Sequence, residues 1–321
     1  MSLSDMPTDL AVPPYLLHPL IPTISPGDVS CAQALGSEVY VGCTNGELIR
    51  YALQVEPDST TQESYSLLSR QSLPNGKPID ELVLVPYMSR VLILSDRQIH
   101  FYTLPSLDPV PNIKPIRHVE TFAVDFCVIK RNSIALHSLY EDRLVYSREI
   151  PFQPGALLAR RAGQYLCVAD SQYYNVVDLH TAQMFPVIPV NQAMDDLTPV
   201  KPFIVVVGEN EFLLLSRTGG STLGVFVTGE GDPVRGTLEW PSHPLSVCLD
   251  YPNITTLLSN GTIEIHSVET QSIIQVVSPP PDGDTVADQR IGLVASLGGY
   301  IVPFSEHSEK MRKTTLRFDR N

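Results

Sequence analysis

The chain has no apolar run of roughly 18 residues, the length needed to cross a bilayer as a helix. Its first twenty residues, MSLSDMPTDLAVPPYLLHPL, lack the basic start and unbroken apolar core of a secretory signal. It also has no CxxC pair and no zinc-ligand spacing. These absences exclude a spanning helix, a signal peptide of the usual kind and the common zinc modules.

Cysteine is scarce and widely spaced, with five residues in 321. Free cysteine packs as a small hydrophobe in reducing compartments, and three of the five have apolar residues on both sides. We therefore expect free thiols rather than disulfides or a metal site at Cys31, Cys43, Cys127, Cys167 and Cys248.

Positive charge is also in short supply, since 22 Lys and Arg stand against 35 Asp and Glu, a net charge of −13. Nucleic-acid binding depends on a basic face, and docking on anionic lipid depends on basic clusters. The charge balance disfavours both functions and is compatible with a protein partner that has a basic surface.

Long amphipathic helices are missing between the strand patterns, which excludes a parallel sheet built from βαβ units. Hairpin patterns recur about every 20 residues instead, and the 28 prolines suit a loop-rich β protein. This arrangement favours radial repetition of small sheets or a large sandwich.

One stretch, 223–267, holds four short strand patterns, which is the size of one propeller blade of roughly 40–45 residues. Within it, Asn260-Gly261 predicts a two-residue type I′ hairpin turn. Thr44-Asn45-Gly46 predicts a second Asn-Gly hairpin between Glu38–Gly42 and Glu47–Tyr51. Thr121–Ile129 is predicted as a single strand.

The fold class predicted is therefore all-β, a β-propeller of six or seven blades, with seven preferred. Residues 1–22 are predicted as an extended arm and residues 23–305 as the propeller. Residues 306–321 are charged and lack proline and glycine, so they are predicted as a linker or the first helix of a truncated helical region.

Candidate sites in the sequence are weak. Gly219-Gly220-Ser221 lacks the lysine and helix of a phosphate loop, and no GxSxG elbow occurs. His243 and His266 are interpreted as strand-edge residues rather than ligands. The acid pairs Asp80-Glu81 and Asp195-Asp196 are interpreted as solvated charge.

Two further features of the sequence are candidates for contact with a partner protein. Trp240 is either an interface anchor or, as we prefer, part of the packing between blades. A basic cluster is interpreted mainly as a solvated helical face, with contact to an acidic partner as the alternative; it comprises Lys310, Arg312, Lys313, Arg317 and Arg320. No catalytic, cofactor, metal or partner-binding residue is assigned from the sequence.

Several phrases resemble a known family. They are the LYEDR phrase at 139–143 followed by Arg148-Glu149-Ile150, the segment 210–214 running into 224–228, the stretch 240–267, and the segment 77–109. Together they resemble the citron homology (CNH) domain. More narrowly, they are similar to the N-terminal domain of the TGF-β-receptor-associated-protein family, which includes the fungal vacuolar-sorting subunits of the CORVET tether.

The resemblance implies a non-catalytic propeller, without cofactor, that precedes an α-solenoid and lies peripherally on endosomal or vacuolar membranes from the cytoplasm. It implies binding of a GTP-loaded Rab GTPase, early-endosomal rather than late, and of other tether subunits before membrane fusion. Two alternatives remain open. One is a scaffold that contacts other subunits or receptor tails, and the other is the related HOPS subunit. An enzyme would require histidines and acids that converge at the central channel.

Overall fold

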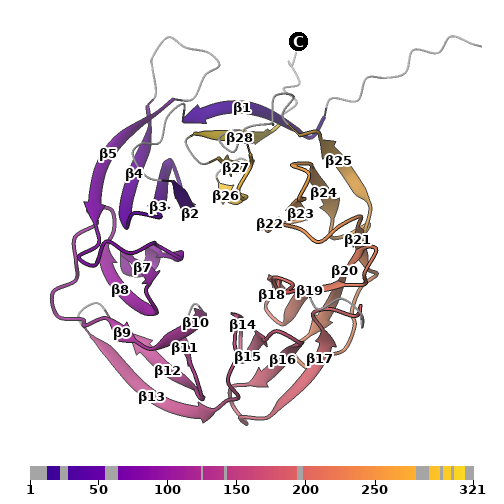
Figure 1. Ribbon diagram of the computed structural model, residues 1–321, viewed down its shortest axis with the longest axis horizontal. Coiled ribbons are helices and arrows are strands. Elements are labelled where there is room, and N and C mark those ends of the chain that lie inside the picture. The colour runs from indigo at the N-terminus through magenta and orange to yellow at the C-terminus, as the bar shows by residue number, and fades with distance from the viewer. Residues whose placement is uncertain are drawn as a thin grey trace, which may run out of the picture.

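The computed structural model describes residues 13–21, 28–54, 64–123, 126–140, 143–193, 198–279, 289–296, 299–304 and 307–314. Seven four-stranded antiparallel sheets stand around a central channel (Figure 1). The seven-bladed all-β prediction is confirmed. One short 3-10 helix, η1 (Pro86–Met88), is the sole helical element of these residues.

We number the blades I to VII in chain order of their innermost strands. Blades I to III contain β2 (Val29–Leu35), β3 (Glu38–Cys43), β4 (Glu47–Gln54) and β5 (Ser64–Ser72); β6 (Glu81–Val85), β7 (Arg90–Ser95), β8 (Gln98–Thr103) and β9 (Ile116–Arg117); and β10 (Val119–Ala123), β11 (Cys127–Lys130), β12 (Ser133–Leu139) and β13 (Leu144–Pro151).

Blades IV to VI contain β14 (Leu158–Ala162), β15 (Tyr165–Ala169), β16 (Tyr173–Asp178) and β17 (Met184–Pro189); β18 (Ile204–Gly208), β19 (Glu211–Arg217), β20 (Thr222–Thr228) and β21 (Leu238–Trp240); and β22 (Ser246–Asp250), β23 (Asn253–Leu257), β24 (Ile263–Ser267) and β25 (Ile273–Val277). Blade VII contains β26 (Val294–Ser296), β27 (Gly299–Pro303), β28 (Ser308–Lys313) and β1 (Tyr15–Ile21).

The hydrophobic core is divided among the blade interfaces. Each of its seven clusters joins two neighbouring blades, as where Val119 and Phe122 of β10 pack with Phe101 of β8. Since the side chains of a strand alternate between its two faces, the middle strands of a blade bury both faces against neighbours. This explains their nearly continuous apolar sequences.

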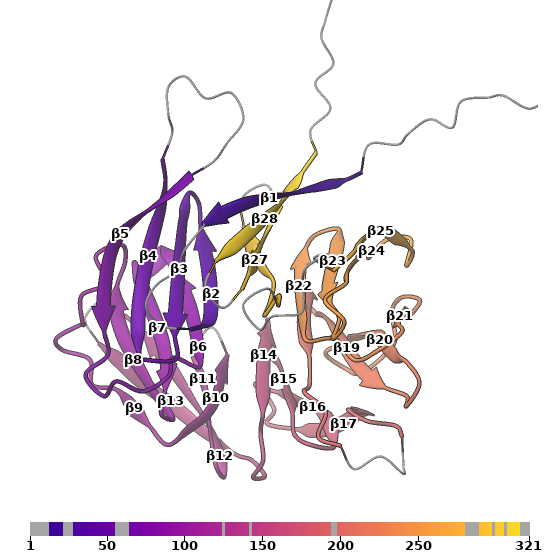
Figure 2. The same ribbon diagram turned by 45° about the horizontal axis from the view of Figure 1, so that its top comes forward.

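The two ends of the described chain meet in blade VII. Strand β1 pairs antiparallel with β28, from Tyr15 opposite Lys313 to Ile21 opposite Ser308. The two strands lie side by side at one side of the ring (Figure 2). The helix predicted within 306–321 is therefore wrong for Ser308–Lys313. Pairing with β27 and β1 satisfies the backbone on both sides, and this tertiary context overrides local propensity.

The predicted N-terminal arm is likewise wrong for Tyr15–Ile21, which closes the ring as the outermost strand of blade VII. The rest of the arm, 1–12 and 22, and the tail beyond 314 lie outside the described residues. The ring is therefore closed by noncovalent pairing between segments nearly 300 positions apart, which no local pattern indicates.

The type I′ prediction for Asn260-Gly261 is wrong. Only Gly261 has a positive φ, of 80°, and its N–H donates to the Leu258 carbonyl at 3.0 Å. The turn is therefore a three-residue loop that ends in a left-handed glycine. Gly46 repeats this geometry with Cys43. The mirror-image turn occurs instead at Asp96-Arg97, where both φ angles are positive.

The predicted blade 223–267 does not coincide with a blade of the structure but spans parts of two blades. Its first two strands, β20 and β21, are the outer half of blade V, and β22 to β24 begin blade VI. Local strand patterns do not distinguish an inner strand from an outer one, because the distinction depends on position in the ring. The predicted strand Thr121–Ile129 is in fact two strands, β10 and β11, which pair antiparallel with each other, and β17 was not predicted.

Candidate functional site

The two histidines and the tryptophan lie in or beside the interface between blades V and VI. Trp240 is fully buried, and its ring centroid lies 5.1 Å from that of His266, which is 2% exposed. Trp240 thus has the packing role that we preferred. The strand-edge interpretation of His266 is wrong, since β24 is an interior strand of blade VI.

His243 lies before β22 and fixes a loop. Its Nε2 donates to the Lys201 carbonyl at 2.7 Å, and its Nδ1 lies 3.2 Å from the Thr222 hydroxyl. Burial lowers the pKa of His243, which favours the neutral ring, and the Thr222 hydroxyl can then donate to Nδ1. The residue therefore holds the backbone of Lys201 in place.

The charged candidates do not converge. Asp80 is exposed, whereas Glu81 forms an ion pair with Arg160, and Asp195-Asp196 lies outside the described residues. In the basic cluster, Lys310 is buried while Arg312 and Lys313 are exposed on β28, so they do not form a helical face. Arg317 and Arg320 lie outside the described residues, and Gly219-Gly220-Ser221 occupies the β19–β20 turn.

All five cysteines are free, as predicted. Burial raises the pKa of Cys43 to about 11 and that of Cys31 and Cys248 to about 12. These thiols therefore stay protonated at neutral pH and are poor nucleophiles. Within the described part of the chain, no group of three or more His, Cys, Asp or Glu side chains is arranged to hold a metal ion.

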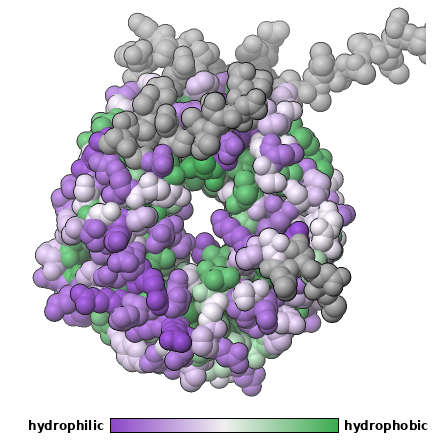
Figure 3. Space-filling view, in the orientation of Figure 1, coloured by the Kyte–Doolittle hydropathy of each residue, from purple (hydrophilic) through white to green (hydrophobic). Residues whose placement is uncertain are grey.

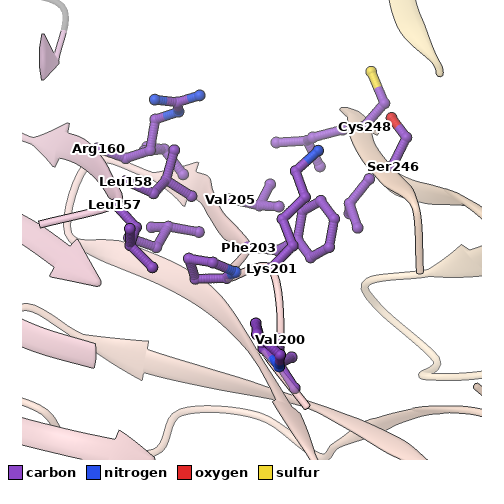
Figure 4. A pocket seen from close by; sticks show the side chains of 15 residues that line it. Leu157, Leu158, Arg160, Val200, Lys201, Phe203, Val205, Ser246 and Cys248 are labelled. Carbon is purple, nitrogen blue, oxygen red and sulfur yellow. The ribbon is translucent and has the colours of Figure 1, made fainter. Parts of the chain in front are cut away.

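The candidate site is a hollow in the wall of the central channel, between the inner strands β14, β18 and β22 (Figure 4). It has a volume of about 850 Å³. Val200 to Val206 line its middle, Leu157, Leu158 and Arg160 one wall, and Ser246 to Leu249 the other. We call it the channel hollow.

Two of the strands around the channel hollow are accessible along nearly their whole length. Every residue of β22, and every residue of β18 after Ile204, is partly exposed. The inner strand of blade III, β10, by contrast buries four of its five residues. Blades V and VI therefore pack tightly at Trp240 but leave their inner ends open toward the channel.

Lys201 supplies the positive charge of the channel hollow. Its Nζ lies 5.2 Å from the centroid of the Phe203 ring and 3.4 Å from the Leu245 carbonyl (Figure 4). No carboxylate of the described residues forms a salt bridge with it. Desolvation lowers the pKa of Lys201, so a nearby anion would stabilise its charged form.

A second cation, Arg160, projects from the wall formed by β14. Its Nη2 lies 3.2 Å from Glu81 Oε1 on β6, so this ion pair joins blades IV and II past blade III. Burial raises the pKa of Glu81, and the charge of Arg160 opposes that shift. Arg160 is therefore compensated, and Lys201 remains the cation available to a ligand.

Exposed apolar side chains border the channel hollow. Leu157, just before β14, is 53% exposed, and Leu245, just before β22, is 45% exposed. Figure 3 shows hydrophobic surface beside the central opening, over β14 and β18. At the corresponding position before β2, blade I presents the exposed Asp28 instead. The sequence does not indicate this site, because single leucines before strands carry no recognisable signal.

The VPS3 N-terminal domain family model matches residues 26–279. The chain belongs to this family. It is similar to longer proteins: human transforming growth factor-beta receptor-associated protein 1 is 25% identical over 86% of this chain and 33% of its own length. Vacuolar protein sorting-associated protein 3 of Saccharomyces cerevisiae is 22% identical over 85% of the chain and 28% of its own length.

This VPS3 N-terminal domain thus spans about a third of the curated relatives that it matches. Among solved structures, the AfRom2 CNH domain superposes with a TM-score of 0.59 at 16% identity, covering 91% of this chain and 96% of its own. U3-55K gives 0.65 at 9% identity, with 92% and 98% covered. These likenesses show the propeller fold. None of the helices in the described ranges has the length and apolarity to cross a bilayer.

Proposed function

We propose that this VPS3 N-terminal domain is a non-catalytic interaction module of a membrane-tethering complex of the CORVET type. In this proposal it recognises a GTP-loaded Rab GTPase during vesicle-mediated protein transport. The observation that carries the proposal is the family match over 254 residues, together with relatives named for vacuolar protein sorting and receptor association. Exposed apolar residues at the channel support a protein partner.

The proposal also covers the partners of the domain and its location in the cell. The domain acts from the cytoplasm, peripherally on endosomal or vacuolar membranes, alongside other tether subunits. The propeller, which includes β1 and β28 in addition to the predicted range 23–305, precedes an α-solenoid in a longer chain. The relatives' greater length supports that last point, since this sequence covers only a third of them.

Calorimetry against endosomal Rabs in both nucleotide states, at physiological salt, tests the proposal. Preference for an early-endosomal Rab in its GTP form is the expected result and supports CORVET membership. Preference for a late-endosomal Rab would assign the chain to the HOPS type instead. Equal affinity for the GDP and GTP forms would contradict effector-type recognition.

The channel hollow favours a second candidate, a scaffold that holds segments of other subunits or of receptor tails. Under this candidate no Rab binds the isolated domain. Deleting the domain from the full-length protein would then abolish assembly of the complex while Rab binding by the remaining subunits persists. Rab binding by the isolated domain would count against this candidate.

A further inference from the structure

We infer that the channel hollow binds an extended peptide in which apolar side chains flank one acidic group. The peptide would lie along β18 and bring its acid to Lys201. This inference concerns a partner separate from a Rab GTPase and stands whether or not the Rab proposal succeeds. It rests on three observations: free strand edges, apolar walls and an isolated cation.

The first observation is that the hollow is lined by strands with one open edge. β14, β18 and β22 are each the end strand of their sheet, and they are the strands nearest the channel (Figure 1). In the described residues no other strand pairs with these channel-side edges. An open edge presents unpaired N–H and C=O groups, and an extended peptide can pair with them.

The second observation is the character of the walls. Val205 and Val206 of β18 are partly exposed in the hollow, as are Leu158 of β14 and Val247 of β22. Apolar walls on both sides of an open strand edge suit a peptide whose alternate side chains point left and right of its backbone. A volume of about 850 Å³ lies within the range of ligand sites in proteins.

The third observation is charge. Lys201 lies in the loop before β18, with its ammonium group above the Phe203 ring and without a carboxylate partner among the described residues. Arg160 stands on the opposite side of the hollow from Cys248 (Figure 4). The chain has a net charge of −13, which as a whole repels acidic ligands, but the local positive charge of Lys201 favours an acidic group at this site. A basic or wholly apolar peptide would leave Lys201 uncompensated.

Contacts within the structure fix the position of Lys201 before any ligand binds. His243 binds its carbonyl and packs against Phe203, with ring centroids 5.6 Å apart, so the loop before β18 is anchored to blades V and VI. Lys201 Nζ in turn reaches the Leu245 carbonyl before β22. The cation therefore needs little reorganisation to meet an anionic group.

Fluorescence anisotropy with a labelled six-residue peptide of valine and leucine that contains one central aspartate tests the inference. A peptide with lysine in place of the aspartate is the matched control. We expect saturable binding of the aspartate peptide, at least about tenfold tighter than the lysine peptide, although net charge alone would favour the lysine peptide. Absence of saturable binding by the aspartate peptide would overturn the inference.

The variant Lys201→Glu should reverse the order of the two peptides. Lys114→Glu, an exposed lysine in the β8–β9 loop, makes the same change in net charge away from the hollow and should leave the order unchanged. Circular dichroism of each variant verifies the fold. Equal effects of the two substitutions would show that the peptide responds to overall charge and not to this site.

Strand pairing has its own test. Hydrogen exchange should slow in β18 when the aspartate peptide binds, and a peptide methylated on its central backbone nitrogens should bind at least about tenfold more weakly. Unchanged affinity of the methylated peptide would overturn the strand-pairing mode.

Discussion

At the scale of single residues, the interface between blades V and VI contains a buried polar group within an apolar cluster. His266 Nε2 lies 3.9 Å from Glu264 Oε2, and the Trp240 and His266 rings meet at an interplanar angle of 64°. Burial lowers the pKa of His266 to about 4 and raises that of Glu264. At neutral pH the ring is therefore neutral, and protonating it would place a charge in the core.

This arrangement predicts a loss of stability in acid. The unfolded chain binds a proton at His266 near pH 6.5, whereas the folded chain does so only near pH 4, so stability is complete above 6.5 and falls toward 4. Between pH 7.5 and 5.0 the wild type should lose roughly 2 kcal/mol more unfolding free energy than His266→Gln. Urea unfolding at both pH values measures this. The raised pKa of Glu264 changes stability with pH in the opposite direction, but Glu264 is present in both proteins. Identical losses of unfolding free energy in the wild type and His266→Gln would contradict the assignment to His266.

At the scale of elements, closure of the ring depends on β1. Tyr15 is 2% exposed, its hydroxyl accepts a hydrogen bond from Asn253 at 3.0 Å, and the Gln275 side chain pairs with its backbone N–H and C=O, both at 2.9 Å. Leu16, the next residue, is 44% exposed. Tyr15 thus anchors blade VII to blade VI, whereas Leu20 and Ile21 of the same strand pack with blade I.

Substitutions at these adjacent positions should differ sharply. Tyr15→Ala should lower the unfolding free energy by about 3 kcal/mol or more, because it removes a buried ring and leaves a cavity. Leu16→Ser, on the exposed face, should change it by less than about 0.5 kcal/mol. Denaturant unfolding followed by circular dichroism compares them. Similar losses in both variants would show that β1 contributes through backbone pairing alone.

At the scale of the whole molecule, the propeller is a closed ring in which the first and last described residues lie side by side in blade VII. Thr314 N–H donates to the Pro14 carbonyl at 2.8 Å, so the two ends of the described chain touch. The connection between β13 and β14 is exposed at Gln153-Pro154-Gly155, and such sites tolerate new termini.

A circular permutant follows from this geometry. It would join residue 314 to residue 13 through a short glycine-serine linker and begin at Gly155. We expect it to fold with a thermal midpoint within about 5 °C of the parent, because the pairing of β1 with β28 becomes local in sequence. Calorimetry and circular dichroism check this. Failure to fold would indicate that the β13–β14 connection holds the ring together.

Much of the propeller could be predicted from local sequence. Strands β3 and β4 pair as a hairpin where Glu38–Gly42 and Glu47–Tyr51 were predicted, and a blade length near 45 residues led to seven blades. The family resemblance also lay in the sequence, in diffuse phrases spread along the chain, and the family model confirms it. These properties depend on neighbours in the chain, which the sequence displays directly.

The tertiary structure alone decided three things. It placed β1 beside β28, it set where each blade begins, and it opened the channel hollow between β18 and β22. Each depends on contacts between residues far apart in sequence, and the strands involved have ordinary local patterns. A lysine before a valine-rich strand is common in sequences. The packing of blade VI beside blade V brings the Leu245 carbonyl within 3.4 Å of Lys201, and this contact between residues far apart in sequence makes Lys201 a candidate binding residue.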